Sequence, residues 1–305
     1  MVDASLAVIT GPTAAGKSAI ALALAERAGA TIVSADSRQI YSGFDIGTAK
    51  PSREERARVP HEGVDVARPD ERWSAARWAD AATGWIEAAH ARGRPSIVVG
   101  GTGFYVQSLV APLAAAPALD PVRRAALAAL LAEVTTPELR RWTTQLDPAR
   151  AHLGRAQLVR AVETVLLAGA RLSDSFVTPA RGAQWSVRYL VIDPGPVLAN
   201  RIEQRVDAML AAGWVDEVRT LMSRVGDGVA AWNACGYEAL RAHAAGTVPL
   251  AAARERVIIA TRQYAKRQRT WMRHQLPESA VTRLDPTAPD AMARAWDWYR
   301  AGGVG

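Results

Sequence analysis

A glycine-rich segment near the start of the chain has residue types suited to binding phosphate. Its residues, Gly11, Pro12, Thr13, Ala14, Ala15, Gly16, Lys17 and Ser18, match the P-loop pattern G-x-x-x-x-G-K-[ST]. In such a loop the backbone N–H groups converge on an anion, the lysine adds positive charge and the serine hydroxyl is a ligand for Mg²⁺. The motif is typical of nucleotide-binding and ATP-binding proteins. It predicts a di- or triphosphate ligand without deciding which.

The acidic Mg²⁺ ligand of an ordinary P-loop NTPase is harder to find. Such an enzyme normally has a carboxylate at the end of another strand. The apolar run Ile97–Val99 leads instead into Gly100–Gly103, which contains no acid. Asp193 follows the run Tyr189–Ile192, but it could equally well cap the next turn. The machinery for hydrolysis is therefore not evident, which favours an enzyme whose P-loop holds a diphosphate as a leaving group.

Two polar residues follow other predicted strands. Asp36 comes directly after the run Thr31–Ser34, so in a parallel sheet it would lie at the edge where the P-loop opens. It could act as a general base with Ser37 and Gln39 nearby, or it could be a helix N-cap. Thr102 lies between glycines after the third strand. Its hydroxyl could approach a phosphate or the attacking group, or the glycines could only form a tight turn.

A basic segment lies near the C-terminus. Between Ala251 and His274 there are seven basic residues against one acid. Four of them, Arg262, Lys266, Arg269 and Arg273, share one face of a predicted helix, and Tyr264 and Trp271 lie close by. A solvated helix face is the ordinary alternative, but exposed faces normally alternate in sign, so we expect a polyanionic partner. Arg201, Glu203 and Arg205 could form either a phosphate clamp or surface ion pairs.

The elements that must position these residues alternate between short apolar strands and helices. Strands are expected at 6–10, 31–34, 96–99 and 189–192, and helices at 18–27, 74–91, 200–222 and 250–273. This order predicts an α/β fold with a P-loop NTPase-like parallel sheet flanked by helices. The alanine-rich segment from about residue 112 to 182 predicts a small inserted helical subdomain. We expect a first core part at 1–112, the inserted subdomain at 113–185, and a second core part at 186–305.

Composition narrows the class of protein. The 305 residues are 49% hydrophobic and 22% charged, with a net charge of +7, which is ordinary for a globular protein apart from the basic excess. No apolar run is long enough to span a membrane, and the N-terminus lacks the features of an export signal. The single cysteine, Cys235, excludes an internal disulfide, and His61 and His152 lack partners at metal-ligand spacing. We expect a cytoplasmic enzyme, and a monomer because nothing demands a dimer.

Several stretches, taken together and in order, resemble the tRNA dimethylallyltransferase (isopentenyltransferase) family. They are GPTAAGKS, SADSRQIYSGFDIGTAKP, VPHEGVD, VVGGTGFY, RIEQRVDAMLAAGWVDEV, ACGYEAL and TRQYAKRQRTWMRH. The resemblance covers roughly residues 6 to 275. It implies transfer of a dimethylallyl group from dimethylallyl diphosphate to N6 of adenosine 37, beside the anticodon of a tRNA, with Mg²⁺ and without ATP hydrolysis.

The resemblance also implies roles for individual residues. The P-loop would hold the diphosphate with Lys17, and Arg205 would reach it. Asp36 would take a proton from the adenine amine, and Thr102 would help to place the nucleophile and the donor. Contacts with the tRNA anticodon stem-loop are implied for Asp36, Ser37, Arg38, Gln39, Thr102, Arg124, Asn233, Ala234, Cys235, Gly236, Tyr237, Glu238, Lys266, Arg267, Gln268, Arg269, Thr270, Trp271, Met272 and Arg273.

One stretch departs from the family pattern. Where the family has an Asn-Asp pair and an arginine, this chain has Leu153–Glu163, in which the pair is missing and Gln157 stands at the position of the arginine. The tRNA contact there would fall to Gln157, or to Arg155 as a substitute. Two other readings stay open. One is a P-loop kinase of a nucleotide or small metabolite, and the other is a non-catalytic RNA-binding protein with a vestigial loop.

Overall fold

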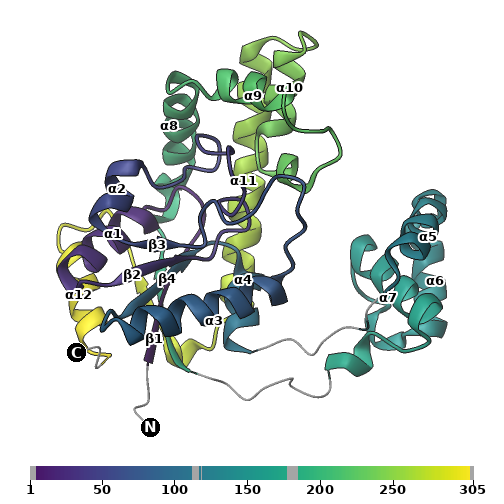
Figure 1. The fold of residues 1–305 in the computed structure, drawn as a ribbon, viewed down its shortest axis with the longest axis horizontal. Helices are drawn as coiled ribbons and strands as arrows, with labels where there is room; N and C mark the ends of the chain where they lie inside the picture. The colour runs from purple at the N-terminus through teal and green to yellow at the C-terminus, as the bar shows by residue number, and fades with distance from the viewer. Residues whose placement is uncertain (1–4, 112–116, 118, 177–184, 303–305) are drawn as a thin grey trace. The chain divides into compact units, whose positions relative to one another are not determined.

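The computed structural model describes residues 5–111, 117, 119–176 and 185–302, and it divides into two compact units. One unit combines residues 1–110 with 184–305, and the other comprises residues 111–183. The expected domain boundary between residues 112 and 113 lies outside the described residues. The larger unit contains the P-loop, and Figure 1 shows its central sheet with helices on both sides.

The sheet of the larger unit has six strands, all parallel, in the order β3-β2-β4-β1-β5-β6. The strands are β1 Ser5–Thr10, β2 Thr31–Ser34, β3 His61–Glu62, β4 Ser96–Gly100, β5 Ser186–Ile192 and β6 Val281–Leu284. The predicted parallel α/β sheet is confirmed. Strand β6 was not predicted, because the sequence after residue 277 carries little signal, yet it pairs with β5 and closes that edge of the sheet.

Both faces of the sheet are buried, as the continuous apolar runs of the strands require. In β1, Leu6 and Val8 point into one core cluster, while Ala7 and Ile9 point into another. The first cluster lies under α3 and α4, and the second lies under α1 and α12. These helices are α1 Lys17–Ala28, α3 Ala75–Ala91, α4 Gly103–Val110 and α12 Ala291–Arg300, while the short α2, Arg53–Arg58, follows the loop after β2.

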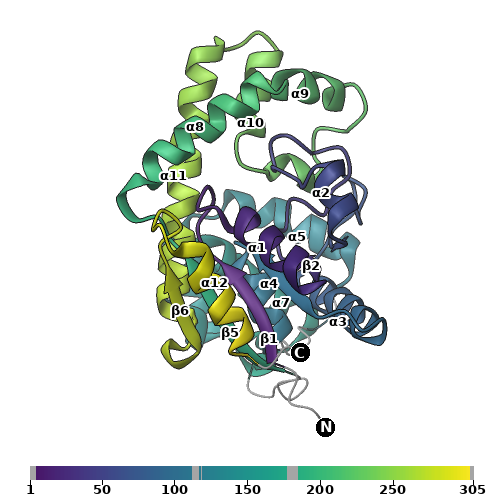
Figure 2. The same ribbon diagram turned by 90° about the vertical axis from the view of Figure 1, so that its left-hand side faces the viewer.

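The remaining helices of this unit lie beyond the carboxyl ends of the strands. They are α8 Leu198–Ala211, α9 Trp214–Met222, α10 Tyr237–Ala244 and α11 Leu250–Gln275. The prediction of one helix over 200–222 was wrong, because the chain turns at Gly213 with a φ of 94°, a value that favours glycine. Helices α8 and α11 lie side by side (Figures 1 and 2). Arg201 and Arg205 of α8 lie near the P-loop edge.

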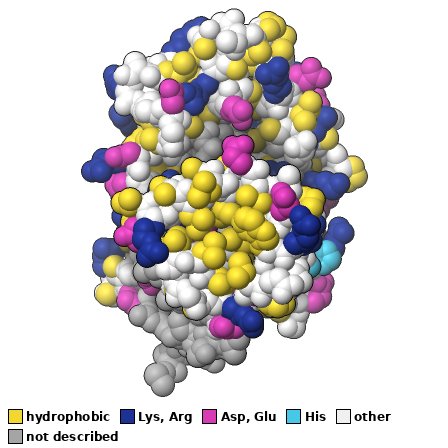
Figure 3. All heavy atoms as spheres, turned by 90° about the vertical axis from the view of Figure 1, so that its right-hand side faces the viewer, with side chains coloured by type: hydrophobic (Ala, Val, Ile, Leu, Met, Phe, Trp, Pro, Cys, Tyr) yellow, Lys and Arg dark blue, Asp and Glu magenta, His cyan; other side chains and the backbone are white. Residues whose placement is uncertain are grey.

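The smaller unit is helical. Its α-helices are α5 Pro121–Glu133, α6 Thr136–Leu146 and α7 Arg155–Ala168, packed around Leu131, Leu139, Leu158 and Val162. Thr135 and Glu138 form a capping box at the start of α6, which supplies partners for two otherwise unpaired backbone N–H groups. Figure 3 looks onto this unit, where hydrophobic side chains gather between charged ones. Exposed apolar residues of the unit include Leu130, Trp142 and Leu166.

Candidate active site

The P-loop connects β1 to α1 and has the geometry of an anion site. Gly11 packs so closely on β5 that a Cβ there would lie 2.2 Å from the Ile192 carbonyl oxygen. Gly16 has a φ of 97° and no side chain caps the start of α1 after it. The backbone N–H groups of the first helical turn therefore remain available to a ligand, at the positive end of the helix dipole. This is the arrangement that the sequence motif predicts.

Lys17 is the lysine of this loop. Its Nζ donates to the Pro12 carbonyl oxygen at 2.8 Å. Burial, followed by the neighbouring Arg205, lowers the pKa of Lys17 to about 7, with Asp36 opposing the change. The site therefore holds a buried amine next to a guanidinium, an arrangement that disfavours the ammonium until an anion enters. A diphosphate would supply that anion.

Two arginines of α8 face the loop. The Nε of Arg201 donates to the Ala14 carbonyl oxygen at 3.0 Å. Arg205, one turn further along, is half-buried, and desolvation lowers its pKa while Asp36 raises it. Of the two alternatives for these arginines, the placement fits the phosphate clamp. The sequence left Arg201 open between these two alternatives, and its spacing of four from Arg205 places both on one helix face.

Asp36 and Thr102 lie at the same edge of the sheet, at the ends of β2 and β4. The Asp36 Oδ1 accepts the Arg38 N–H at 2.8 Å, and residues 37–40 form a turn, so the helix N-cap alternative was wrong. The Thr102 Oγ1 accepts the Ser37 N–H at 3.1 Å. Burial raises the pKa of Tyr264 to about 12, Asp36 adds to this, and a hydrogen bond with Thr102 opposes it. These groups converge on one place.

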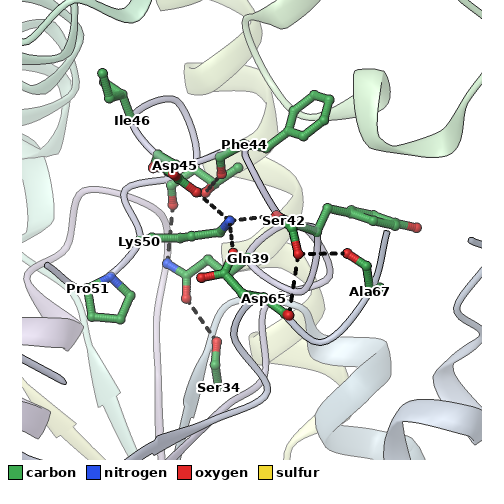
Figure 4. A network of polar contacts seen from close by, with 12 residues as sticks. Ser34, Gln39, Ser42, Phe44, Asp45, Ile46, Lys50, Pro51, Asp65 and Ala67 are labelled. Carbon is green, nitrogen blue, oxygen red and sulfur yellow. Dashed lines mark hydrogen bonds and ion pairs between the residues drawn. The ribbon is translucent and has the colours of Figure 1, made fainter. Parts of the chain in front are cut away.

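The loop after β2 is held rigid by buried polar contacts (Figure 4). The Lys50 side chain is 2% exposed, and its Nζ donates to the Tyr41 carbonyl oxygen at 2.5 Å, to Asp45 Oδ1 at 2.6 Å and to Asp65 Oδ1 at 2.5 Å. All three ammonium protons thus have acceptors in different directions. The fork of an arginine would not reproduce this, which gives a reason for one of the few lysines in the chain.

Gln39 anchors the far end of the same loop. Its Nε2 donates to the carbonyl oxygens of Thr48 and Ala49, and its Oε1 accepts the Ser34 hydroxyl at 2.9 Å (Figure 4). The amide is therefore fully engaged within the protein. The expected tRNA contact of Gln39 gives way to a role in shaping the wall of the site.

Two cavities meet at these residues. The smaller, about 340 Å³, reaches Lys17 and Ser18 of the P-loop. The larger, about 520 Å³, is lined by Thr102 and by α8 and α11 residues. Seven residues line both cavities, which shows that they adjoin: Thr13, Asp36, Thr48, Gly101, Arg205, Tyr264 and Gln268. Asp36 and Arg205 thus stand where an anion in one cavity would meet a molecule in the other.

Three residues with predicted tRNA contacts have side chains that are buried and bonded within the protein. Gln268 accepts the Thr13 N–H at 2.8 Å and donates to the Gly101 carbonyl oxygen at 2.8 Å, so it ties the P-loop to the Thr102 turn. Met272 accepts a contact from the Thr10 hydroxyl within the core. Tyr237 is fully buried and donates to Glu217. These side chains are engaged within the protein, which a motif match cannot reveal because it does not show which way a residue points, and their tRNA contacts stay predictions. Ala234 is buried as well.

The basic helix α11 is partly neutralised by acids from other elements. Arg262 pairs with Glu203, and Arg269 with Asp193. Asp193 also accepts the Gly195 N–H at 3.0 Å, so the turn-capping alternative holds for it. The scarcity of acids within α11 did not show that its basic residues are unpaired, because acids from other segments pair with Arg262 and Arg269.

The exposed residues of α11 remain as a basic surface. Lys266, Arg267 and Arg273 are exposed and have no acidic partner in the described part of the chain. Thr270 is exposed beside them, and Trp271 is half-buried and packs against Gly103, where a Cβ would lie 2.2 Å from the indole. Elsewhere in this unit, Asn233 and Glu238 are exposed. These residues keep the accessibility that a tRNA contact needs.

In the smaller unit, the departure from the family pattern has a structural explanation. Arg155 donates to the carbonyl oxygens of Val134, Leu131 and Ala132, which caps the end of α5. The Gln157 Oε1 accepts the Gly154 N–H at 3.2 Å at the start of α7. Arg155 is therefore engaged in joining α5 to α7. Gln157 caps only its own helix and is exposed, so it keeps the accessibility that its predicted tRNA contact needs.

Arg124 of the smaller unit also has a protein partner. Its Nε donates to Glu163 Oε2 at 3.0 Å, and Glu163 is buried. The guanidinium is still partly exposed, at 41% for the side chain, so it could contact an anion with its remaining donors.

A metal ion would have one side-chain ligand from the loop. Ser18 is exposed to the smaller cavity, and its hydroxyl has no hydrogen-bond partner among the described residues. The described residues contain no group of three or more His, Cys, Asp or Glu side chains that could hold a metal. The residues present therefore fit a Mg²⁺ ion carried mainly by ligand oxygens and water, as P-loop sites arrange it.

Trp214 is the main residue of the site that the sequence reasoning missed. It is buried, lines the larger cavity and lies against Gly47 and Gly236. Both glycines occur in the stretches that carry the family resemblance, and this was the available signal. The sequence does not show that Gly47 and Gly236 must be glycine because the Trp214 ring lies against them; only the fold shows that contact.

The fold and the site define a P-loop α/β protein whose anion site adjoins a second cavity, and the Asp36 carboxylate lines both. The chain belongs to the IPP transferase family, whose sequence pattern matches residues 39–275, and the pattern described as isopentenyl transferase matches residues 4–61. A tRNA dimethylallyltransferase of Anaeromyxobacter dehalogenans is 41% identical over 294 residues, which cover 95% of this chain and 98% of that protein. One of Bordetella parapertussis is 41% identical over 97% of both chains.

Solved structures of transferases that act on tRNA have a similar fold. The tRNA isopentenylpyrophosphate transferase of Bacillus halodurans matches with a TM-score of 0.70 and 31% identity, over 98% of this chain and 96% of that one. A eukaryotic dimethylallyltransferase, described as acting on tRNA, matches with a TM-score of 0.79 and 25% identity, over 97% of this chain and 77% of that one. In the described part of the chain, no helix has the length and apolar character that crossing a membrane would require.

Proposed function

We propose that this protein transfers a dimethylallyl group from dimethylallyl diphosphate to N6 of adenosine 37 in tRNA and releases diphosphate. The observation that carries this proposal is the pair of adjoining cavities, one at the P-loop and one beyond it, with Asp36 and Arg205 lining both. A transferase needs such a junction because two substrates must meet there. The names of the relatives and solved neighbours support the same reaction.

The smaller cavity would hold the donor diphosphate. As the allyl C–O bond breaks, its electron pair leaves with the diphosphate and negative charge grows on those oxygens. The groups placed to stabilise this charge are the N–H groups at the start of α1, Lys17 and Arg205. A Mg²⁺ ion held by Ser18 and the diphosphate would add Lewis-acid stabilisation when bound.

The larger cavity would admit the adenine. The N6 amine is a weak nucleophile because its lone pair is delocalised into the ring. Asp36 would accept the N6 proton as the new C–N bond forms, with Thr102 and Tyr264 bordering the same space. The base must leave its stack, which costs roughly a few kcal/mol, and contacts with the anticodon stem-loop would offset that cost.

The exposed residues of α11 would supply part of those contacts. Lys266, Arg267 and Arg273, which have no acidic partner among the described residues, form a basic surface on the helix that also lines the larger cavity through Tyr264. Phosphate contacts of this kind position the nucleic acid without reading its bases.

We also propose that the protein acts as a monomer in the cytoplasm.

A direct competition separates this reaction from a P-loop kinase. Purified protein with Mg²⁺ should release diphosphate from dimethylallyl diphosphate only when unmodified tRNA is present. It should leave ATP intact with nucleoside or metabolite acceptors. Turnover of ATP without tRNA-dependent release of diphosphate would contradict the proposal. The pairing of Asp193 with Arg269 already argues against Asp193 as the acidic Mg²⁺ ligand that a kinase would use.

A further inference from the structure

The lining of the larger cavity changes from charged to apolar along α8. Arg205, Ile202, Val206 and Met209 all line it, at spacings that place them on one helix face. Arg201, at the start of this row, contacts the P-loop at Ala14. The row therefore begins at the anion site and becomes apolar as it leaves it.

The direction of this row indicates where a prenyl chain would go. At about 1.5 Å per residue, Met209 lies about 6 Å beyond Arg205 along the helix axis. A donor whose diphosphate meets Arg205 and Lys17 can place its hydrocarbon chain along Val206 and Met209. Apolar side chains are the natural lining for that chain.

Trp214 closes this apolar end. A Cβ on Gly47 would lie 2.2 Å from the indole Nε1, and a Cβ on Gly236 would lie 2.4 Å from its Cη2, so the ring is pressed from both sides. The Tyr237 ring packs edge-on at 5.5 Å. An indole confined in this way cannot swing aside for a longer ligand.

Glu217 keeps the Gly47 side of this wall in place. Its carboxylate accepts the N–H groups of Asp45 at 3.0 Å and Ile46 at 2.6 Å, and the Tyr237 hydroxyl at 2.6 Å. Charge-assisted hydrogen bonds of this kind are stronger than neutral ones. The wall is thus fixed from both the loop and the helix.

We propose that Trp214 sets the length of the prenyl group, so that the site takes one isoprene unit and rejects longer allyl diphosphates. The inference rests on the proposed function and adds to it a residue that determines donor specificity. Its physical basis is the cost of forcing extra methylene groups against a rigid, well-packed wall. For Trp214 to act in this way, the apolar end of the cavity must bind the prenyl chain of the donor and not the adenine.

The test compares transfer from dimethylallyl diphosphate and from geranyl diphosphate to the same unmodified tRNA, each expressed as kcat/KM. The wild-type protein should prefer the shorter donor by about tenfold or more. Trp214→Leu should raise the geranyl-to-dimethylallyl ratio by about tenfold or more, because it opens the end of the cavity. Trp78→Leu is the matched control, since Trp78 is equally buried but does not line the cavity, and the ratio should stay at the wild-type value.

Each outcome has one meaning. Equal use of both donors by the wild-type protein would overturn the proposal without any variant. If Trp214→Leu does not fold, Met209→Ala, which shortens a half-buried side chain at the same end, must raise the ratio instead. An unchanged ratio with a raised KM for tRNA would show that the apolar end serves the adenine, which also overturns it. Absence of transfer from either donor would instead contradict the proposed function.

Discussion

The low pKa of Lys17 leads to a quantitative prediction about diphosphate binding. In the free protein the pKa is lowered to about 7 by burial and by Arg205. A bound diphosphate would restore it to the ordinary range, because an adjacent anion favours the ammonium. Binding above pH 7 must therefore be accompanied by uptake of a proton. At about pH 8 the uptake should approach about 0.9 protons, and affinity should fall about tenfold between about pH 6 and pH 8.

Isothermal titration calorimetry with inorganic diphosphate and Mg²⁺ measures both quantities, using buffers with different ionisation enthalpies. Lys17→Arg is the control, since a guanidinium stays charged throughout this pH range. The titration of the diphosphate itself is common to both proteins, so their difference isolates the lysine. If the two proteins take up the same number of protons and weaken equally with pH, the reasoning about Lys17 is refuted.

Three further predictions follow from the same contacts. Asp36→Asn should lower kcat by about 10² to 10⁴ while tRNA affinity measured by filter binding stays nearly unchanged, and a large loss of affinity would make Asp36 chiefly a contact. Neutralising Lys266 and Arg273 should flatten the salt dependence of tRNA binding by about one unit of slope per lost phosphate contact, whereas Arg262→Gln, whose charge is already paired with an acid, should change it less. Lys17→Met should raise the thermal midpoint at pH 7, because the folded pKa lies below the unfolded value of 10.5 and the unfolded chain binds more protons between about pH 7 and 10.5. The gain in unfolding free energy is up to about 5 kcal/mol, and an unchanged midpoint would show that the amine is not desolvated.

The sequence was sufficient for the parts of the site that depend on local patterns. The P-loop needs its glycines and lysine at fixed spacing, and Asp36 and Thr102 follow strands of a parallel sheet, whose carboxyl ends meet at one edge. The fold class and the family follow from the same stretches. Arg205 lines the same cavity as Lys17. Its spacing alone left two readings open, and its role toward the diphosphate, implied by the resemblance, stays a prediction.

What the sequence could not give depends on contacts between distant segments. Trp214 acquires its position from Gly47 and Gly236, which lie far from it along the chain. Tyr237 and Met272 lie within motifs implied to touch tRNA, but a motif does not reveal that a side chain points into the core. The amphipathic pattern of a helix indicates which of its residues are buried. It does not identify Glu203 and Asp207 of α8 as the partners of arginines in α11.

The most direct test of the central claim is the chemical identity of the product. Purified protein is incubated with dimethylallyl diphosphate, Mg²⁺ and an unmodified anticodon stem-loop. The RNA is then digested to nucleosides, to identify the modified base, and to oligonucleotides, to locate it, and both are analysed by mass spectrometry. The account predicts an adenosine heavier by one dimethylallyl group, at position 37, in the wild-type reaction and strongly reduced with Asp36→Asn. A wild-type reaction that leaves every adenosine unmodified would contradict it.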